Sequence, residues 1–325
     1  MEKGLTRVKE KIEDGMLIGS IYDQIMKHTR YNYYKLSPLY NELTAHKHRM
    51  LYYKRLRKQY LSKCTEECYW EKLEKNKNKD VIWFSWLQGI DNAPLIVKRC
   101  LESIKEEFPD KEIRLVDLNN VFDYITLPDH IMNKWKKGII GYAHLSDMIR
   151  LELLIKYGGY WIDSTVLCTD GTELRMVEDY SLFMYSFFYF DFNPEIMEYN
   201  NWLIYSETNN NILCLIREIL YSYWKDYNRA INYFIFHIIT TIAMEYYEAE
   251  ASLIPTVSQV PAHILAKYIF DEFEQNKYDL LLKTTGIHKL STRFDQDMLT
   301  KKGTFYDVII NHEKNKGRID GRAAD

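Results

Sequence analysis

The sequence predicts an α/β fold: a Rossmann-like, mostly parallel central sheet flanked by helices, behind a helical N-terminal extension. Two observations predict the sheet. Residues 81–86 and 112–116 are short apolar runs typical of buried strands, and residues 94–107 between them repeat apolar side chains at helical spacing. A strand–helix–strand unit of this kind places its strands parallel. A change in charge near residue 80 predicts the extension.

The extension, residues 1–79, is basic. It holds 18 Lys and Arg against 10 Asp and Glu, a net charge of +8, whereas the remaining residues hold 25 against 36, a net charge of −11. The basic amphipathic run 51–61 predicts a helix packed on the rest of the chain with its basic face in solvent; the alternative is a peripheral contact with an anionic membrane. With a break at Ser37-Pro38, helices are expected over residues 4–12, 16–29 and 41–63.

Residues 80–313 are expected to form one domain and residues 314–325 a disordered tail. After the strands at 81–86 and 112–116, the elements expected by pattern are a helical segment at 122–137, a polar loop at 169–179, strands at 181–190 and 200–206, and helices at 211–226 and 233–247. His237 lies in an apolar helical run and is interpreted as a core residue. Trp202 fits a core position and a stacking surface equally well.

Composition and missing motifs exclude several classes of protein. The five cysteines include Cys64 and Cys68, but no second pair at zinc-finger spacing accompanies them. No G-x-G-x-x-G and no G-x-x-x-x-G-K-[ST] occurs, which disfavours a dinucleotide-dependent dehydrogenase and a P-loop kinase. No nucleic-acid-binding module occurs, so no nucleic acid partner is expected. Without a signal-like N-terminus or an 18-residue apolar run, the protein is expected to be cytoplasmic.

One stretch organises the chain. Residues 147–156 predict a mostly buried helix, which Gly158-Gly159 ends because glycine tolerates positive φ. Residues 160–167 then read as one short buried strand that carries Asp163, and α/β folds bind ligands at the carboxyl ends of such strands. Asp147 and Arg150 lie three residues apart on one helix face, so both can act on the same ligand.

A family resemblance rests on this stretch, the run SDMIRLELLIKYGGYWIDST at residues 146–165. It resembles the S-D-x-x-R, apolar run and G-G-x-Y-x-D-x-D signature of sugar-nucleotide glycosyltransferases with a DXD-type motif. The similarity is to the capsular polysaccharide synthesis branch and, more distantly, to mannosyl- and galactosyltransferases of the Gly_transf_sug type. It extends from about Val81 to about Arg293, with the first 79 residues outside it. The resemblance implies a bacterial enzyme with a GT-A fold, whose central sheet is mixed but mostly parallel.

The resemblance also implies where a nucleotide-sugar donor binds. The turn after the first strand cradles the nucleotide, and the C-terminal run Ile287-His288-Lys289-Leu290-Ser291-Thr292-Arg293 resembles the segment that closes over the diphosphate. Asp147 and Arg150 are expected to hold the hydroxyls of the donor sugar. The donor-binding residues implied are Trp86, Gln88, Gly89, Asp147, Arg150, Lys289 and Arg293.

A divalent cation, Mn²⁺ or Mg²⁺, is implied as the cofactor. Its ligands would be Asp163, Thr165 and His288. This chain departs from the family at Thr165, where the second acidic residue of the motif is expected. A hydroxyl brings no charge, and hard cations prefer oxygen ligands with charge among them.

The function implied is a retaining transfer of a hexose from a nucleotide sugar, UDP-linked, to a glycan or lipid-linked acceptor in capsular or surface polysaccharide synthesis. Asp147, Arg150 and Asp163 are the expected catalytic residues, and Glu207 and Asp191 are weaker candidates for a carboxylate near the reacting carbon. Two alternatives stay open: a metal-independent transferase, and a catalytically silent scaffold that binds glycan. The basic extension could bring the protein to the inner face of the plasma membrane.

Overall fold

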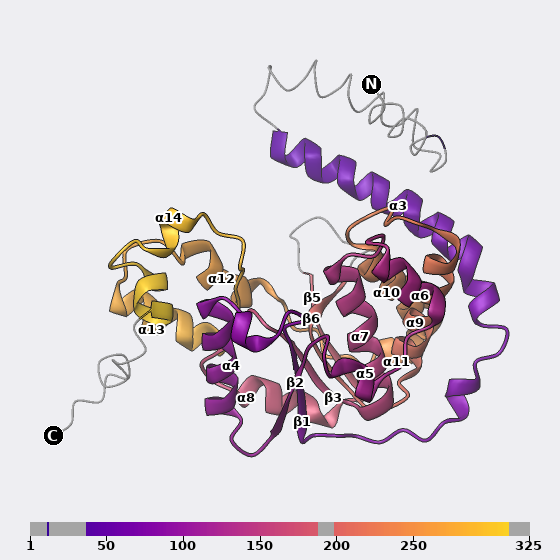
Figure 1. Ribbon diagram of the computed structural model, residues 1–325, viewed down its shortest axis with the longest axis horizontal. Coiled ribbons are helices and arrows are strands. Elements are labelled where there is room, and N and C mark those ends of the chain that lie inside the picture. The colour runs from indigo at the N-terminus through magenta and orange to yellow at the C-terminus, as the bar shows by residue number, and fades with distance from the viewer. Residues whose placement is uncertain (1–11, 13–36, 188–197, 312–325) are drawn as a thin grey trace.

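The computed structural model describes residue 12 and residues 37–187 and 198–311 (Figure 1). The expected helices at 4–12 and 16–29 lie outside these residues, apart from residue 12 itself, and so do Asp191 and the expected tail at 314–325.

The central sheet has five strands in the order β2-β1-β3-β6-β5. Strand β1 is parallel to both of its neighbours, β2 and β3, whereas β6 is antiparallel to β3 and β5. Four of the five strands therefore run in one direction, and the expected mixed, mostly parallel sheet is confirmed. The strands are β1 Val81–Ser85, β2 Glu112–Val116, β3 Gly159–Asp163, β5 Leu182–Ser186 and β6 Tyr199–Ser206.

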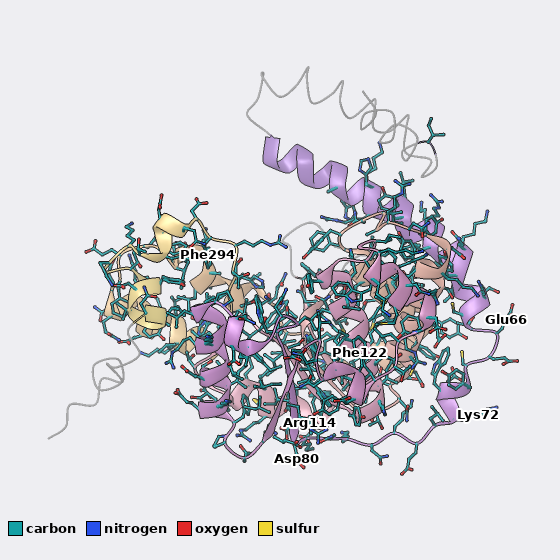
Figure 2. The ribbon with its side chains drawn as sticks, viewed as in Figure 1. Glu66, Lys72, Asp80, Arg114, Phe122 and Phe294 are labelled. Carbon is teal, nitrogen blue, oxygen red and sulfur yellow. The ribbon has the colours of Figure 1, made fainter. Side chains whose placement is uncertain are left out.

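Helices cover both faces of the sheet, which explains why its strands are apolar without alternation. In β1, Val81 and Trp83 face one core and Ile82 and Phe84 face the other, and all four are buried. The first core includes α7 Tyr142–Tyr157, α9 Asn211–Asp226 and α10 Ile235–Tyr246; the second includes α4 Leu95–Glu107 and α12 Val260–Tyr268. Figure 1 shows these two groups of helices on opposite sides of the sheet, and side chains fill both layers (Figure 2).

Helix α3, Ser37–Cys64, packs on α9 and α10 (Figure 1). Tyr52, Leu56 and Tyr60, at helical spacing, are buried in the first core, and the Tyr60 hydroxyl donates to Asp226 Oδ2 over 2.9 Å. The expected helix at 41–63 is confirmed, but Ser37-Pro38 starts it instead of preceding it. Proline is tolerated in a first turn, where its missing N–H would be unpaired anyway. None of the described helices is long and apolar enough to cross a membrane.

The expected single strand at 160–167 is wrong. Strand β3 ends at Asp163, the chain turns at Ser164-Thr165, and β4, Val166–Cys168, leaves the main sheet to pair antiparallel with β7, Ile287–Lys289. The apolar run is continuous because each half is buried, β3 between β1 and β6 and β4 against α4.

The expected polar loop at 169–179 is also wrong, since α8, Thr172–Arg175, and a 3-10 turn at Met176–Asp179 occupy most of it. Buried Leu174 and Val177 anchor this segment, and Asp170 Oδ1 accepts from the Thr172 N–H over 2.8 Å. The segment expected at 122–137 divides into two helices. The remaining elements are α5 Val121–Tyr124, α6 Asp129–Lys136, α11 Glu248–Ala251, α13 Gln275–Thr284, α14 Gln296–Leu299, 3-10 turns at Tyr69–Lys72 and Ile90–Asn92, and a π turn at Asp307–Asn311.

Candidate active site

The junction between α7 and β3 sets the position of the site. Gly158 has φ 67° and donates its N–H to Leu154 O over 2.8 Å, which ends the helix as expected. Gly159 has φ 91° and lies so close to β1 that a Cβ there would be 2.5 Å from Val81 O. Strand β3 therefore starts directly beside β1, and at its other end Asp163 is the register partner of Ser85.

A cleft of about 510 Å³ opens at the carboxyl ends of β1 and β3. Its walls come from the turn after β1, the first half of α7, the turn between β3 and β4, the start of β6, the residues around the start of α10, and the segment at the end of β7. Most of the site residues expected from the sequence line it together: Trp86, Gln88, Asp147, Arg150, Asp163, Thr165, Lys289 and Arg293.

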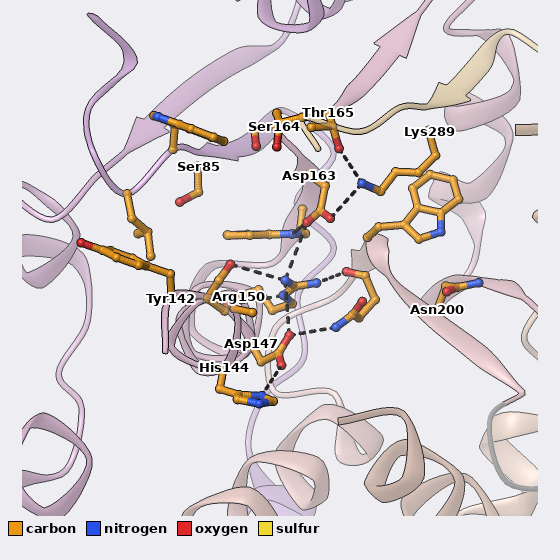
Figure 3. A pocket seen from close by; sticks show the side chains of 18 of the residues that line it. Ser85, Tyr142, His144, Asp147, Arg150, Asp163, Ser164, Thr165, Asn200 and Lys289 are labelled. Atoms are coloured by element: carbon orange, nitrogen blue, oxygen red, sulfur yellow. Dashed lines mark hydrogen bonds and ion pairs between the residues drawn. The ribbon is translucent and has the colours of Figure 1, made fainter. Parts of the chain in front are cut away.

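Arg150 links the two carboxylates of the cleft (Figure 3). Its side chain is only 6% exposed, and its Nη2 lies 3.3 Å from Asp147 Oδ1 and 3.7 Å from Asp163 Oδ1. Nη1 donates to the carbonyl of Asn201, and the guanidinium stacks 4.9 Å from the ring centre of Trp161. Arg150 is thus fixed on all sides, as its planar fork of donors allows.

Asp147 sits deep in the cleft. Its Oδ1 also accepts from Asn201 Nδ2 over 2.8 Å, and its Oδ2 lies 3.6 Å from His144 Nδ1. Asn201 comes from β6, and His144 lies one turn before Asp147 on α7. The carboxylate is held by a neutral amide and the shared arginine, and an imidazole lies beside it.

Asp163 lies nearer to solvent, with 26% of its side chain exposed. Its Oδ1 accepts from Trp161 Nε1 over 2.9 Å, and its Oδ2 is 3.5 Å from Lys289 Nζ. The same ammonium donates to Thr165 Oγ1 over 2.5 Å (Figure 3). Lys289 reaches this position because β7 pairs with β4, with Lys289 opposite Val166.

Two expected site residues lie elsewhere. Gly89 has φ 84° in the turn that follows β1, where its N–H donates to Trp86 O, and it does not line the cleft. His288 is fully buried, its Nε2 lies 3.0 Å from Thr169 Oγ1, and burial lowers its pKa to about 4. Successive strand residues face opposite sides, so Lys289 faces the cleft and His288 faces away. This position is incompatible with the expected role of His288 as a metal ligand.

Other residues of the cleft were missed or misinterpreted from the sequence. His237, interpreted as a core residue, lines the cleft, and burial lowers its pKa to about 4. Trp202 packs as a core residue, stacked on Tyr185 with 4.7 Å between ring centres, and it also lines the cleft. Its use as a stacking surface for a ligand stays a prediction. Glu207 lies outside the cleft. Two features of the sequence could have revealed more of the cleft. His144 lies one turn before Asp147 on the same helix, and polar residues precede Trp202 on β6.

Several buried polar atoms around the cleft have no hydrogen-bond partner in the described part of the chain. Buried polar atoms are normally paired, so a group of unpaired ones points to a missing ligand or water. Those on residues that line the cleft are Ser85 Oγ, Trp86 Nε1, His144 Nδ1, Trp202 Nε1 and His237 Nδ1. Two indole N–H groups among them can only donate, which favours a ligand rich in oxygen acceptors.

Comparison with known families shows which family this chain belongs to. A family model described as capsular polysaccharide synthesis protein matches residues 32–309. The chain belongs to this family. The match contains every cleft residue and begins before α3, so the expectation that the first 79 residues lie outside the family region is wrong for residues 32–79.

Two curated relatives match over shorter stretches. This family member is 34% identical over 95 residues to the glycosyltransferase afumC of Aspergillus fumigatus, covering 26% of this chain and 24% of the relative. It is 32% identical over 92 residues to the O-glycosyltransferase braB of Annulohypoxylon truncatum, covering 26% and 22%. The matches thus span about a quarter of each relative's length. Among solved structures, the PaToxG glycosyltransferase aligns with a TM-score of 0.36 and 12% identity, over 80% of this chain and 98% of that one.

Proposed function

We propose that this family member is a glycosyltransferase. It moves a hexose from a nucleotide sugar, UDP-linked, to a hydroxyl of a glycan or lipid-linked acceptor, in the synthesis of capsular or other surface polysaccharide. The observation that carries the proposal is the convergence of Arg150, Asp163 and Lys289 in one cleft at the carboxyl ends of parallel strands. The family, and the two relatives named as glycosyltransferases, support it.

The donor would lie along the charged wall of the cleft. Lys289 and Arg293 would take the diphosphate, because Lys and Arg bind phosphate oxygens through charge-assisted hydrogen bonds. The unpaired Trp86 Nε1 and the exposed amide of Gln88 would take the nucleoside end. Asp147, with Asn201, would accept hydrogen bonds from the hydroxyls of the donor sugar.

Aromatic side chains also line the cleft and favour a sugar acceptor. They are Tyr142, Phe187, Tyr233 and Phe234, and the two tyrosines are 47% and 59% exposed. An aromatic ring offers an apolar face to the C–H side of a sugar, while a tyrosine hydroxyl hydrogen-bonds its rim.

The transfer would break the bond between the anomeric carbon and the diphosphate oxygen, and the bonding electron pair would leave with the diphosphate. The acceptor oxygen would form the new bond to that carbon, and its proton would pass to the departing phosphate oxygen. Lys289 and Arg293 would stabilise the charge that develops on the diphosphate. Among the described residues, the cleft carboxylates are Asp147 and Asp163, both paired with Arg150. This supports a leaving group that serves as its own base, and hence retention.

The protein would contact an anionic membrane through the basic face of helix α3. Its apolar residues Tyr52, Leu56 and Tyr60 are buried in the core, whereas Lys54 and Lys58 are exposed. A contact through this helix would be electrostatic, and salt would release it from anionic vesicles.

Incubation with a panel of UDP- and GDP-sugars tests the proposal. We expect slow hydrolysis of one donor, with the released sugar first appearing in the α configuration in proton NMR spectra. Asp163→Asn should lower the hydrolysis rate about a hundredfold, whereas Asp123→Asn, an exposed aspartate of α5 outside the cleft, should leave it unchanged. Failure of every donor to bind or react, in protein shown to be folded by circular dichroism, would contradict the proposal.

A further inference from the structure

The oxygen atoms at the expected metal site do not fit a divalent cation. Mn²⁺ and Mg²⁺ take several oxygen ligands, with negative charge among them. Asp163 supplies one carboxylate, Thr165 supplies a neutral hydroxyl, and His288 faces away. Within the described residues, no three or more His, Cys, Asp or Glu side chains form a group that could hold a metal ion.

Donors surround the carboxylate where an ion would need acceptors. Asp163 Oδ1 accepts from the Trp161 indole over 2.9 Å and lies 3.7 Å from Arg150 Nη2. Its Oδ2 faces Lys289 Nζ at 3.5 Å. A further cation on this carboxylate would be repelled by two fixed positive charges in a partly buried cleft, where the effective dielectric is lower than in water.

The Lys289 ammonium lies between the two motif residues that would coordinate the ion, 2.5 Å from Thr165 Oγ1 and 3.5 Å from Asp163 Oδ2. The backbone holds it there, because Lys289 pairs with Val166 and the Leu290 N–H donates to Thr165 O over 2.8 Å. The side chain is 18% exposed and lines the cleft, so the charge is available to a ligand.

We propose that the Lys289 ammonium takes the place of the divalent cation, so that this site binds the donor diphosphate without Mn²⁺ or Mg²⁺. An ammonium has three N–H donors. Thr165 accepts from one of them, and the ion pair with Asp163 holds the ammonium in place, so N–H groups remain available to a phosphate oxygen. Thr165 at the second motif position then has a physical reason: its hydroxyl accepts from the ammonium and adds no charge that would draw a metal ion. That this diphosphate belongs to a sugar donor rests on the proposed function, whereas binding of a diphosphate without a metal ion does not.

Calorimetry on the full chain tests the binding part with two probes, MnCl₂ alone and inorganic pyrophosphate in EDTA. We expect no Mn²⁺ binding and measurable pyrophosphate binding. Lys289→Met should weaken pyrophosphate binding about tenfold or more, the loss of one charge-assisted hydrogen bond. Lys277→Met is the matched control, because this exposed lysine of α13 pairs with Glu274 outside the cleft. Circular dichroism checks that both variants are folded.

The outcomes separate this inference from the proposed function. Mn²⁺ binding that Asp163→Asn removes would overturn the inference, and so would a lack of pyrophosphate binding in EDTA or equal affinities in Lys289→Met and wild type. Metal-free pyrophosphate binding that depends on Lys289, with no turnover of any nucleotide sugar, would uphold the binding site and contradict the proposed function. Turnover undiminished by EDTA would support both.

Discussion

Asp147 and Asp163 belong to one motif, share one arginine and line one cleft, yet their surroundings differ. Asp147 is 10% exposed, and its further partners are the Asn201 amide and the His144 imidazole. Asp163 is 26% exposed, and its further partners are the Trp161 indole and the Lys289 ammonium. The buried carboxylate contacts side chains of the interior of the cleft, and the more exposed one is paired with the Lys289 ammonium that we propose binds the diphosphate. The contrast predicts that the two carboxylates affect stability and activity in different proportions.

Removal of the shared arginine should have the largest effect. Arg150→Met leaves two carboxylates without their common counter-charge, one of them nearly buried. We expect the free energy of unfolding to fall by about 3–5 kcal/mol, because breaking a buried ion pair strands the remaining charge. Urea denaturation measures this. Arg175→Met, which removes an exposed pair with Asp110, should cost less than about 1 kcal/mol. Equal losses in the two variants would contradict the linking role of Arg150.

Asp163→Asn should act mainly on activity. It removes the charge that orients Lys289, and we expect the transfer or donor-hydrolysis rate to fall about a hundredfold, the usual effect of losing one preorganised electrostatic contact. The free energy of unfolding should change by about 1 kcal/mol or less, since the side chain is partly exposed. A large loss of stability with little loss of rate would reverse the comparison.

Asp147→Asn should lower the free energy of unfolding more than Asp163→Asn does. The buried carboxylate loses its charge beside Arg150 and keeps an amide contact with Asn201, so we expect a loss of about 2 kcal/mol in the free energy of unfolding. Parallel urea titrations of the two aspartate variants provide the test. If Asp163→Asn is the less stable of the two, the assignment of Asp147 to the interior is wrong.

The pH dependence of stability should report on the two buried histidines, with an effect per histidine no larger than that of Asp147→Asn. Burial lowers the pKa of His288 and of His237 from 6.5 to about 4. Between those values the unfolded chain binds more protons than the folded one, so stability should fall as pH drops from 6.5 to 4. We expect a loss of about 2 kcal/mol per histidine between pH 7 and pH 5.

His288→Gln should remove about half of this loss and leave pyrophosphate affinity unchanged, because His288 faces away from the cleft. Urea titrations at the two pH values measure the first effect and calorimetry the second. An unaltered pH dependence would contradict the burial of a neutral His288, and a weakened affinity would show that His288 acts on the ligand after all.

Local patterns were sufficient to predict the part of the site that is close in sequence. Asp147, Arg150 and Asp163 lie within one helix–glycine–strand unit. Gly158 and Gly159 have positive φ, and the pair of glycines in the sequence indicates this turn directly. The strand–helix–strand opening was predictable for the same reason. The mixed direction of the sheet followed from the family resemblance.

The C-terminal side of the site was harder to predict because its geometry is non-local. Strand β7 has three residues, too few for a period, and it exists because it pairs with β4 more than a hundred residues earlier. The sequence alone allowed both His288 and Lys289 to point into the cleft. In a strand, successive side chains face opposite sides, so Lys289 lines the cleft and His288 is buried. The contacts of His237 and Asn201 were not predictable for the same reason. Tertiary packing brings both to the motif, so His237 was interpreted as a core residue and Asn201 was given no role of its own.

A crystal structure with a nucleoside diphosphate bound tests the central claim most directly. The account predicts the diphosphate in the cleft, with a terminal phosphate oxygen within hydrogen-bond distance of Lys289 Nζ beside Asp163 and Thr165. A diphosphate bound elsewhere, or one held in the cleft by a metal ion on Asp163 with Lys289 displaced, would contradict it.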